Sequence, residues 1–257
     1  MPGPETAHSP TADDLNALYT VMVVIAIVLV VAINAALIAL AIRFRAARGR
    51  QPRRLKSRGV VQAGAAAAFA VLAAVIFVAG VVTTQNASEV EASGSEGLQS
   101  SSQLTAQRSL DLPSGDDVPE PLEVEATGQQ WIWRYEYPDG TFSYYELVVP
   151  VDTAVVVKLA STDVVHRWWV PGLGGKFDAV PGQSNQTWFK VDADELGEDG
   201  EATFEGASYA FSGAAYAAMR TRVRAVSATE YEAWLAEQAA GIQEAQAFVQ
   251  EQVAEGE

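Results

Sequence analysis

The sequence predicts two membrane-spanning helices followed by a small all-β domain of Greek-key type and a C-terminal helix. Residues 15–42 and 59–88 contain no charged side chain, and each stretch exceeds the ~20 apolar residues that a membrane-spanning helix needs. Since lipid offers the backbone no hydrogen-bond partner, both stretches should be helical. After residue 121, short runs of alternating character are separated by Gly and Pro, which is typical of a β domain.

Shifts in composition divide the chain into five parts. Residues 1–14 are polar and contain three prolines, so we expect a flexible N-terminus. Residues 15–85 form the helical hairpin, with one helix at Leu15–Arg45 and the other at Gly59–Thr84. Residues 86–120 are rich in Ser, Gly and Pro and are expected to be a polar linker. The β domain then covers residues 121–227, and a C-terminal helix and tail cover residues 228–257.

The charges around the hairpin predict its orientation. Eight basic residues and no acidic residue lie from Arg43 to Arg58, and loops of this kind stay in the cytoplasm. Both termini and the β domain are therefore expected on the outer face of a plasma membrane crossed twice. The first apolar run follows no basic segment and is too long for the core of a leader, which favours a retained anchor over a cleaved leader.

The part of the chain after the hairpin is strongly acidic. From Gln85 onward there are 29 acidic and nine basic residues, a net charge of −20. This charge argues against nucleic-acid binding, which requires a positive footprint. It suits either a solvated surface in a saline habitat or the docking of a basic electron carrier. The chain has no cysteine, which excludes disulfides, thiolate metal sites and thiol nucleophiles.

The β domain is expected to contain eight strands. In Gln130–Tyr137, aromatic and other side chains alternate strictly, and Pro138-Asp-Gly140 has the composition of a turn. Ser227-Ala-Thr-Glu230 fits a capping box that starts the final helix, whose apolar stripe begins at Tyr231. The expected strands are Leu122–Ala126, Gln130–Tyr137, Phe142–Val149, Thr153–Ala160, Val164–Val170, Gln186–Val191, Ala202–Glu205 and Arg220–Val226.

Three stretches resemble subunit II of haem-copper terminal oxidases. They are Gly128-Gln-Gln-Trp-Ile-Trp-Arg-Tyr-Glu-Tyr-Pro138, the segment from Ser161 through His166-Arg-Trp-Trp-Val-Pro to Gly182, and the loop Glu205–Met219. The resemblance implies a cupredoxin-like domain on a two-helix anchor. It also implies a catalytic subunit I that holds haems and copper, a neighbouring subunit III, and a setting in membrane lipid.

In cytochrome-c-oxidising members of this family the domain holds a dinuclear copper centre. By resemblance, its ligand positions are His166, Ser208, Ala210, Ser212, Tyr216 and Met219 in this chain. Bridging thiolates are soft donors that a serine hydroxyl cannot replace at neutral pH, so we expect no copper and no other cofactor bound by this chain. The family also places a magnesium-binding Glu where Ala210 stands, so that ligand is missing.

The resemblance also gives expectations for the contents of the former copper pocket and for two positions outside it. His166 is expected to be hydrogen-bonded within the former copper pocket, and a single residual metal shared with Met219 is the alternative. Phe211 and Tyr216 are expected to fill that pocket. Trp131 matches the aromatic residue that faces the electron donor in the family, and Gln62 is the nearest candidate for the Glu at the mouth of a proton path.

The composition of the loop is similar to that of the quinol-oxidase branch of the family, which lost the same copper. The stretch around His166, in contrast, has the residues typical of the cytochrome c branch, including the histidine. The resemblance therefore implies a copper-free subunit II of a proton-pumping respiratory oxidase, with quinol oxidised in the catalytic subunit and no catalytic residue in this chain. One alternative is a soluble cytochrome or cupredoxin as donor without the copper relay. Another is an accessory membrane adaptor outside any oxidase.

Overall fold

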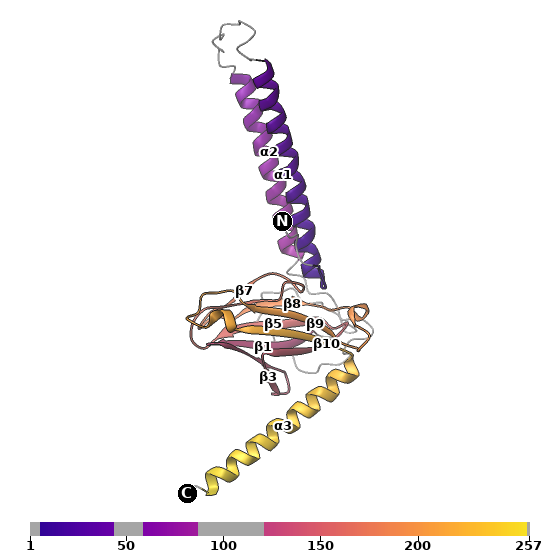
Figure 1. Ribbon diagram of the computed structural model, residues 1–257, viewed down its shortest axis with the longest axis vertical. Helices are drawn as coiled ribbons and strands as arrows, with labels where there is room; N and C mark the ends of the chain where they lie inside the picture. Colours follow the sequence, from indigo (N-terminus) through magenta and orange to yellow (C-terminus); the bar gives the residue numbers. More distant parts are fainter. Residues whose placement is uncertain (1–5, 44–58, 87–120, 256–257) are drawn as a thin grey trace. The chain divides into compact units, whose positions relative to one another are not determined.

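The computed structural model describes residues 6–43, 59–86 and 121–255 (Figure 1). The chain separates into two compact units: residues 16–85 form one, and residues 1–15 with 86–257 form the other. The basic loop and most of the expected polar linker, residues 87–120, lie outside the described residues.

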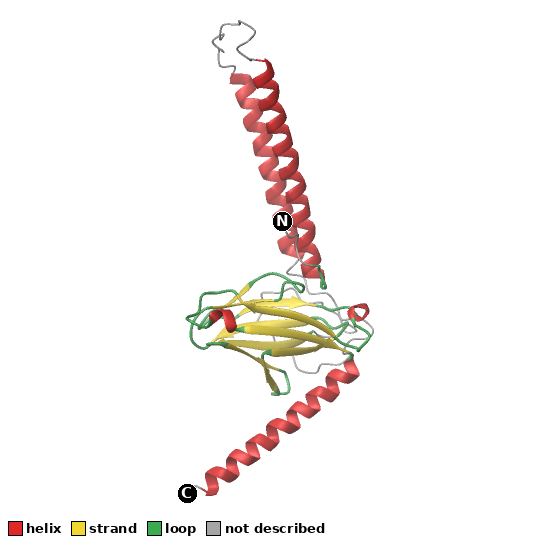
Figure 2. Ribbon diagram, viewed as in Figure 1, coloured by secondary structure: helices red, strands yellow, loops and turns green. Residues whose placement is uncertain are grey.

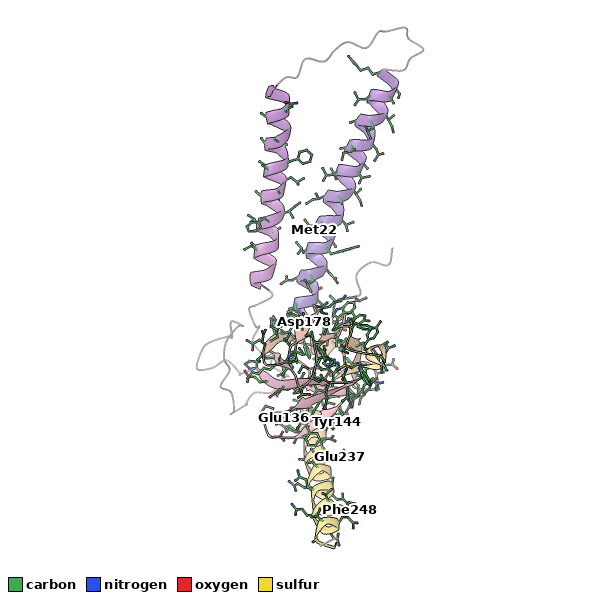
Figure 3. All side chains as sticks on the ribbon, turned by 90° about the vertical axis from the view of Figure 1, so that its left-hand side faces the viewer. Met22, Glu136, Tyr144, Asp178, Glu237 and Phe248 are labelled. Carbon is green, nitrogen blue, oxygen red and sulfur yellow. The ribbon has the colours of Figure 1, made fainter. Side chains whose placement is uncertain are left out.

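Two long helices form the first unit. Helix α1 covers Pro10–Arg43 and α2 covers Gly59–Asn86, and both are long and apolar enough to cross a membrane. Most of their described large apolar side chains are exposed, as lipid-facing positions require. Figure 3 shows these side chains along both helices, with Met22 among them. The prediction of two apolar helices is confirmed.

The N-terminal end of α1 differs from the expectation. The helix begins at Pro10 rather than Leu15, and Ser9 and Thr11 are buried instead of loosely ordered. Both hydroxyls donate hydrogen bonds to the carbonyl oxygen of Leu173, at 2.6 and 2.9 Å. His8 adds a 2.6 Å contact from its Nδ1 to Glu195. This segment is ordered because distant residues satisfy its polar groups, and composition alone does not reveal such partners.

The second unit is built on two five-stranded sheets (Figure 2). The first sheet has the order β3-β2-β1-β5-β8, and the second has the order β4-β10-β9-β6-β7. The pairs β1–β5 and β4–β10 are parallel, and the other pairs are antiparallel. The strands are β1 Leu122–Gln129, β2 Ile132–Glu136, β3 Phe142–Tyr144, β4 Glu146–Pro150, β5 Val155–Ser161, β6 His166–Trp169, β7 Phe177–Ala179, β8 Asn185–Phe189, β9 Ala202–Ser208 and β10 Arg220–Val226. Two short 3-10 turns, η2 at Ala193–Glu195 and η3 at Tyr216–Ala218, complete the domain.

Strand β10 lies where the sequence predicts it, but four other features differ from the expectation. The run Phe142–Val149 is broken at Tyr145, whose φ of 69° turns the chain from the first sheet into the second. Gln130 and Trp131 form the turn between β1 and β2 instead of starting a strand. The three-residue strand β7 was not predicted, because so short a run carries no periodicity. β9 extends to Ser208, which shortens the loop that follows it.

The core lies between the inward faces of the two sheets. Trp133 and Tyr135 of β2 are fully buried beside aliphatic residues such as Val124 and Leu147. Burial raises the pKa of the Tyr135 hydroxyl well above its usual value, and that hydroxyl accepts a 3.0 Å hydrogen bond from Trp168 Nε1. From Trp133 onward, the buried face of β2 is therefore the aromatic face that the sequence alternation predicts.

Helix α3, Ala228–Glu255, closes the chain. Ser227 Oγ accepts a hydrogen bond from the Glu230 amide at 3.2 Å, as a capping residue should. Tyr231 is buried, and Trp234 and Leu235 pack against the core. The expected architecture is confirmed: two N-terminal apolar helices, a cupredoxin-like β domain and a C-terminal helix.

Candidate functional site

The positions expected to have held copper gather where β6, β9 and β10 meet. Ser208 ends β9 and lies opposite Trp168 of β6, and its amide donates to the Met219 carbonyl oxygen at 2.8 Å. That bond closes the loop of residues 209–219. His166, Ser208 and Met219 are 0%, 4% and 0% exposed, respectively, so each of these three positions is buried.

His166 is held from two sides. Its Nε2 donates a 2.8 Å hydrogen bond to Asp163 Oδ1, and its ring packs edge-on against Trp133 with centroids 6.0 Å apart. Because an ionised carboxylate only accepts, Nε2 carries the proton of this hydrogen bond. Among the described residues, the buried Nδ1 of His166 has no hydrogen-bond partner. The expectation that His166 is hydrogen-bonded therefore holds for one ring nitrogen.

Asp163 organises the turn beside His166, a role that the sequence interpretation missed. Desolvation, the largest single influence, raises the pKa of this carboxyl. Hydrogen bonds from the Gln130 amide, His166 and the Val164 amide together outweigh it and lower the pKa to about 2. The Gln130 amide bond is 2.8 Å long and ties the β1–β2 turn to the β5–β6 loop. The only signal in the sequence was an Asp three residues before a His, which is too common to interpret.

Gly128 allows this packing. A Cβ atom added there would lie 2.9 Å from His166 Cδ2 and 3.1 Å from Trp133 Cζ3. Real Cβ contacts are almost never that short, and both neighbours are buried rings that cannot swing away. The glycine in the quoted motif therefore makes room for the imidazole.

The two serines that the resemblance places at thiolate positions, Ser208 and Ser212, have different environments. Ser208 Oγ accepts a 3.2 Å hydrogen bond from the Arg167 amide, so its hydroxyl is used in closing the sheet edge. Ser212 is 3% exposed, and its Oγ has no partner among the described residues. Its carbonyl oxygen accepts bonds from Gln130 Nε2 at 2.7 Å and from Trp131 Nε1 at 3.0 Å.

Trp131 is thus bound inward by its polar edge while its ring is 38% exposed. Gly213 has a φ of 107° and passes close to the indole, where a Cβ would lie 3.2 Å from Trp131 Cζ2. Glycine is favoured at this position for two reasons: its φ is positive, and a side chain would contact the indole ring too closely. Trp131 therefore links the β1–β2 turn to the loop and remains partly exposed.

The expectation that Phe211 and Tyr216 fill the former metal pocket is wrong. Phe211 is 83% exposed and Tyr216 is 37% exposed, and their rings pack against each other at 5.1 Å between centroids. Residues 216–218 form η3, in which no residue is buried. Ala210 is partly buried. Gln62 lies in α2, in the other compact unit, and is exposed.

The donor set does not fit a dinuclear copper centre. The buried atoms that could face a metal are one imidazole nitrogen, one thioether and two hydroxyls, from His166, Met219, Ser208 and Ser212. Soft bridging thiolates, which such a centre requires, are absent from the sequence. Within the described ranges, no three His, Cys, Asp or Glu side chains come together in a metal-binding arrangement.

Comparison with known proteins identifies the family. Residues 141–226 match the family model for cytochrome c oxidase subunit II, periplasmic domain. The β domain belongs to the cytochrome c oxidase subunit II family. The matched range includes His166, Ser208 and Met219, so the positions that the resemblance assigned to copper lie within it. The two apolar helices and this domain together fit a membrane protein with an extracytoplasmic domain.

The relatives carry the same name. A cytochrome c oxidase subunit 2 of Alkalihalophilus pseudofirmus is 31% identical over 142 residues, 55% of this chain and 39% of that protein. The subunit 2 of Cereibacter sphaeroides is 32% identical over 165 residues, 49% of this chain and 52% of that protein. The chain thus spans about half or less of these relatives. The periplasmic domain of subunit II of Bradyrhizobium japonicum is 30% identical, with 50% of this chain and 97% of that chain covered and a TM-score of 0.43.

Proposed function

We propose that this chain is a copper-free subunit II of a proton-pumping haem-copper terminal oxidase. Electrons enter the complex from a membrane quinol, which is oxidised in the catalytic subunit together with the reduction of dioxygen to water. This chain binds no cofactor and contributes structure. The observation that carries the proposal is the buried set around His166, which keeps the imidazole and the Met219 thioether but has serines at both thiolate positions.

The chemistry of those serines supports the loss of the metal. A serine hydroxyl stays protonated at neutral pH and is a hard donor, so it cannot bridge two copper ions as thiolates do. Ser208 Oγ already accepts the Arg167 amide. Tyr216, at the position of the second imidazole, faces outward. Ser208, Ser212 and Tyr216 therefore supply none of the thiolate or imidazole donors that such a centre uses.

Without a relay, the domain has a scaffolding role on the outer face of the oxidase. Its partners are the catalytic subunit I, which holds the haems and copper, and subunit III, with lipid around α1 and α2. Ala210 cannot supply a magnesium ligand, so any such site must be completed by the catalytic subunit. Proton entry through this chain has no acidic residue at Gln62 to use.

A soluble donor is the second candidate, and one observation favours it. Trp131 keeps an exposed ring face on an acidic domain, and opposite charge steers a basic carrier toward such a surface. Electrons would then have to reach the haem subunit directly, over a longer path than the copper relay provides. We therefore rank the quinol first.

Oxygen uptake by the purified complex tests the proposal. We expect rapid oxygen uptake with a reduced quinol and little with reduced cytochrome c. Complexes that lack this chain should be less stable but should still contain their haems. Copper should be found only in the amount that the catalytic subunit holds. Fast oxidation of cytochrome c with negligible quinol activity, or two additional coppers for each copy of this chain, would overturn the proposal.

A further inference from the structure

The segment in which α1 begins, residues 6–12, is bound to the loop between β6 and β7. The Ser9 and Thr11 hydroxyls both donate hydrogen bonds to the Leu173 carbonyl oxygen, at 2.6 and 2.9 Å, and all three residues are buried. A carbonyl oxygen has two lone pairs, so both are used by this one segment. We call residues 6–12 the strap and residues 170–175, which include Leu173, its seat.

His8 adds three contacts between the strap and the β domain. Its amide donates a 2.9 Å hydrogen bond to the Gly172 carbonyl oxygen of the seat. Its Nδ1 lies 2.6 Å from the Glu195 carboxylate of η2, and its ring lies beside that of Phe204 in β9, with centroids 5.2 Å apart. The strap therefore contacts a loop, a 3-10 turn and a strand of the domain.

The glycines of the seat leave the room that the strap occupies. A Cβ atom added at Gly172 would lie 3.2 Å from His8 Cδ2, and one added at Gly174 would lie 3.1 Å from Thr11 Oγ1. Both distances are shorter than ordinary van der Waals contact, so a larger residue at either position would press on the strap. Close approach of one backbone segment to another is a common reason for glycine.

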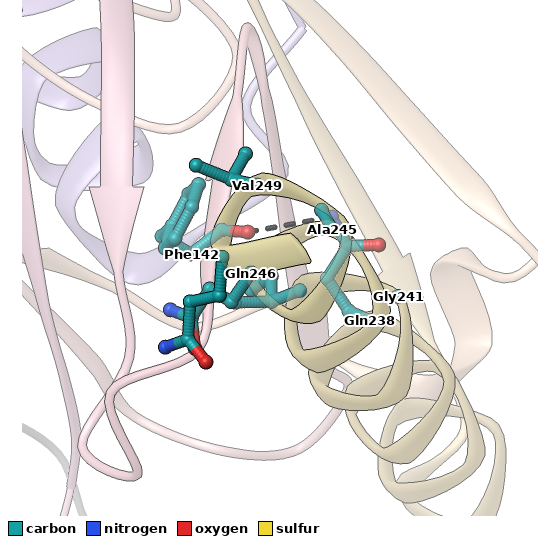
Figure 4. Close-up of a pocket in the computed structure, with 8 residues that line it drawn as sticks. Phe142, Gln238, Gly241, Ala245, Gln246 and Val249 are labelled. Carbon is teal, nitrogen blue, oxygen red and sulfur yellow. Dashed lines mark hydrogen bonds between the residues drawn. The ribbon is translucent and has the colours of Figure 1, made fainter. Parts of the chain in front are cut away.

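Helix α3 also packs on the domain, but it is fitted less closely. Gln238 Nε2 donates a 3.3 Å hydrogen bond to the Phe142 carbonyl oxygen, beside a groove of about 640 Å³ (Figure 4). Gly241 borders that groove, and a Cβ atom added there would meet nothing within 4 Å. A close fit around glycine is therefore a property of the strap and its seat, and not of every segment that packs on this domain.

Trp169, the last residue of β6, joins the seat to the loop of residues 209–219. Its Nε1 donates a 3.2 Å hydrogen bond to the Gly174 carbonyl oxygen of the seat. Its ring packs edge-on against Tyr209, with centroids 4.7 Å apart. Lys176 Nζ lies 4.0 Å from the centroid of the Trp169 ring and 5.3 Å from that of Tyr209. The seat and the loop thus share one indole.

We propose that the strap braces the loop of residues 209–219: it fixes the seat, and the Trp169 indole passes this restraint on to Tyr209. Coupling of this kind travels through contiguous packing and hydrogen bonds, and the contacts of the seat with the strap and with Trp169 form such a series. Residues 1–15 belong to the same compact unit as the β domain, so the start of α1 takes part in holding the loop. The brace acts within this chain, so it can fail while the proposed function stands, and the reverse.

Hydrogen exchange of the full chain in lipid nanodiscs tests the brace. The variant S9A/T11A removes both hydroxyls from the seat, so the strap should open roughly 5 to 30 times more often, as measured at the His8 amide. The Tyr209 amide, which is hydrogen-bonded in the native fold, should exchange faster by a factor of about 2 to 30. The Tyr231 amide in α3 is hydrogen-bonded as well and serves as the control, which should not change.

A second variant tests whether Trp169 carries the effect. W169F keeps an aromatic ring but removes the indole N–H that donates to the seat. In a W169F background, S9A/T11A should still increase exchange at the His8 amide. The added effect of S9A/T11A at the Tyr209 amide should then fall below about twofold, because the two sites no longer share a contact.

A disulfide tests the same contact by strengthening it, because the chain has no cysteine of its own. A Cβ atom at Gly174 would lie 3.8 Å from Thr11 Cβ, a separation typical of disulfides. T11C/G174C should therefore form an intramolecular bond under mild oxidation, which should slow exchange at the Tyr209 amide until the bond is reduced. The control is T11C/G182C. Gly182 also has a positive φ, but a Cβ atom added there would meet nothing within 4 Å, so this pair should stay reduced.

Three results would overturn the proposal. The strap would have no fixed seat if T11C/G182C formed its disulfide as readily as T11C/G174C. The strap would not brace the loop if neither S9A/T11A nor the disulfide changed exchange at the Tyr209 amide. Trp169 would not be the connection if S9A/T11A acted on Tyr209 equally with and without W169F. If S9A/T11A unfolded the whole domain, exchange at Tyr231 would rise too, and the disulfide, which adds a bond, would then decide.

Discussion

The contact between Gly128 and His166 allows a sharp test of how the site is packed. In G128A the new methyl group would lie 2.9 Å from His166 Cδ2 and 3.1 Å from Trp133 Cζ3. Overpacking of this kind costs about 1–3 kcal/mol. For a folding unit of this size that corresponds to a lower melting temperature by roughly 2–12 °C. The shortest of these contacts is with His166, so the destabilisation by G128A should depend on the presence of the imidazole.

A double-mutant cycle isolates that dependence. In an H166A background the space beside residue 128 is released, and G128A should then cost less than about 0.5 kcal/mol. Tryptophan fluorescence is the assay, because all six tryptophans lie between residues 131 and 234 and therefore report on the β-domain unit alone. The full chain in nanodiscs is unfolded thermally and in urea.

A second glycine provides the matched control. Gly241 lies in the exposed part of α3, and a Cβ added there would meet nothing within 4 Å. G241A should therefore stabilise the helix by about 0.5–1 kcal/mol. The reasoning would be refuted if G128A were as harmless as G241A, or if it cost the same with and without the His166 side chain.

Two further predictions concern the same site. The Asp163 carboxyl has its pKa lowered to about 2, so its contribution to stability is present above pH ~4 and is lost as the pH falls toward 2; D163N should remove this part of the acid sensitivity in pH-dependent unfolding curves. Restoring soft donors with S208C, S212C and Y216H should let the full chain take up copper, seen as thiolate-to-copper absorption in the visible range, while wild type and the same triple variant with H166Q stay colourless. Copper uptake by wild type, or an unchanged acid transition in D163N, would contradict these expectations.

Several elements could be predicted because their cause is local. The two apolar helices follow from stretches without charge, since lipid and backbone hydrogen bonding leave no other structure. β10 and the capped start of α3 follow from the alternation in residues 220–226 and from Ser227. The missing thiolates around His166 follow from composition, because a chain without cysteine has none in any fold.

The remaining features depend on contacts between residues far apart in the chain. Tyr145 moves the strand into the other sheet because the pairing partners of β3 and β4 differ, and nothing in the run Phe142–Val149 signals that change. The order of residues 8–12 comes from the carbonyl of Leu173. The exposure of Tyr216 and Phe211, rather than their burial, is likewise a property of the folded loop.

The sequence by itself thus determined which chemistry is missing from the site, since donor atoms are a property of residue types. Only the tertiary structure decided what replaced it: Asp163 bound to His166, the Ser212 carbonyl clamping Trp131, and aromatic rings left outside. The physical reason is that hydrogen bonds and packing depend on which residues the fold brings together, and these residues are tens of positions apart in the sequence.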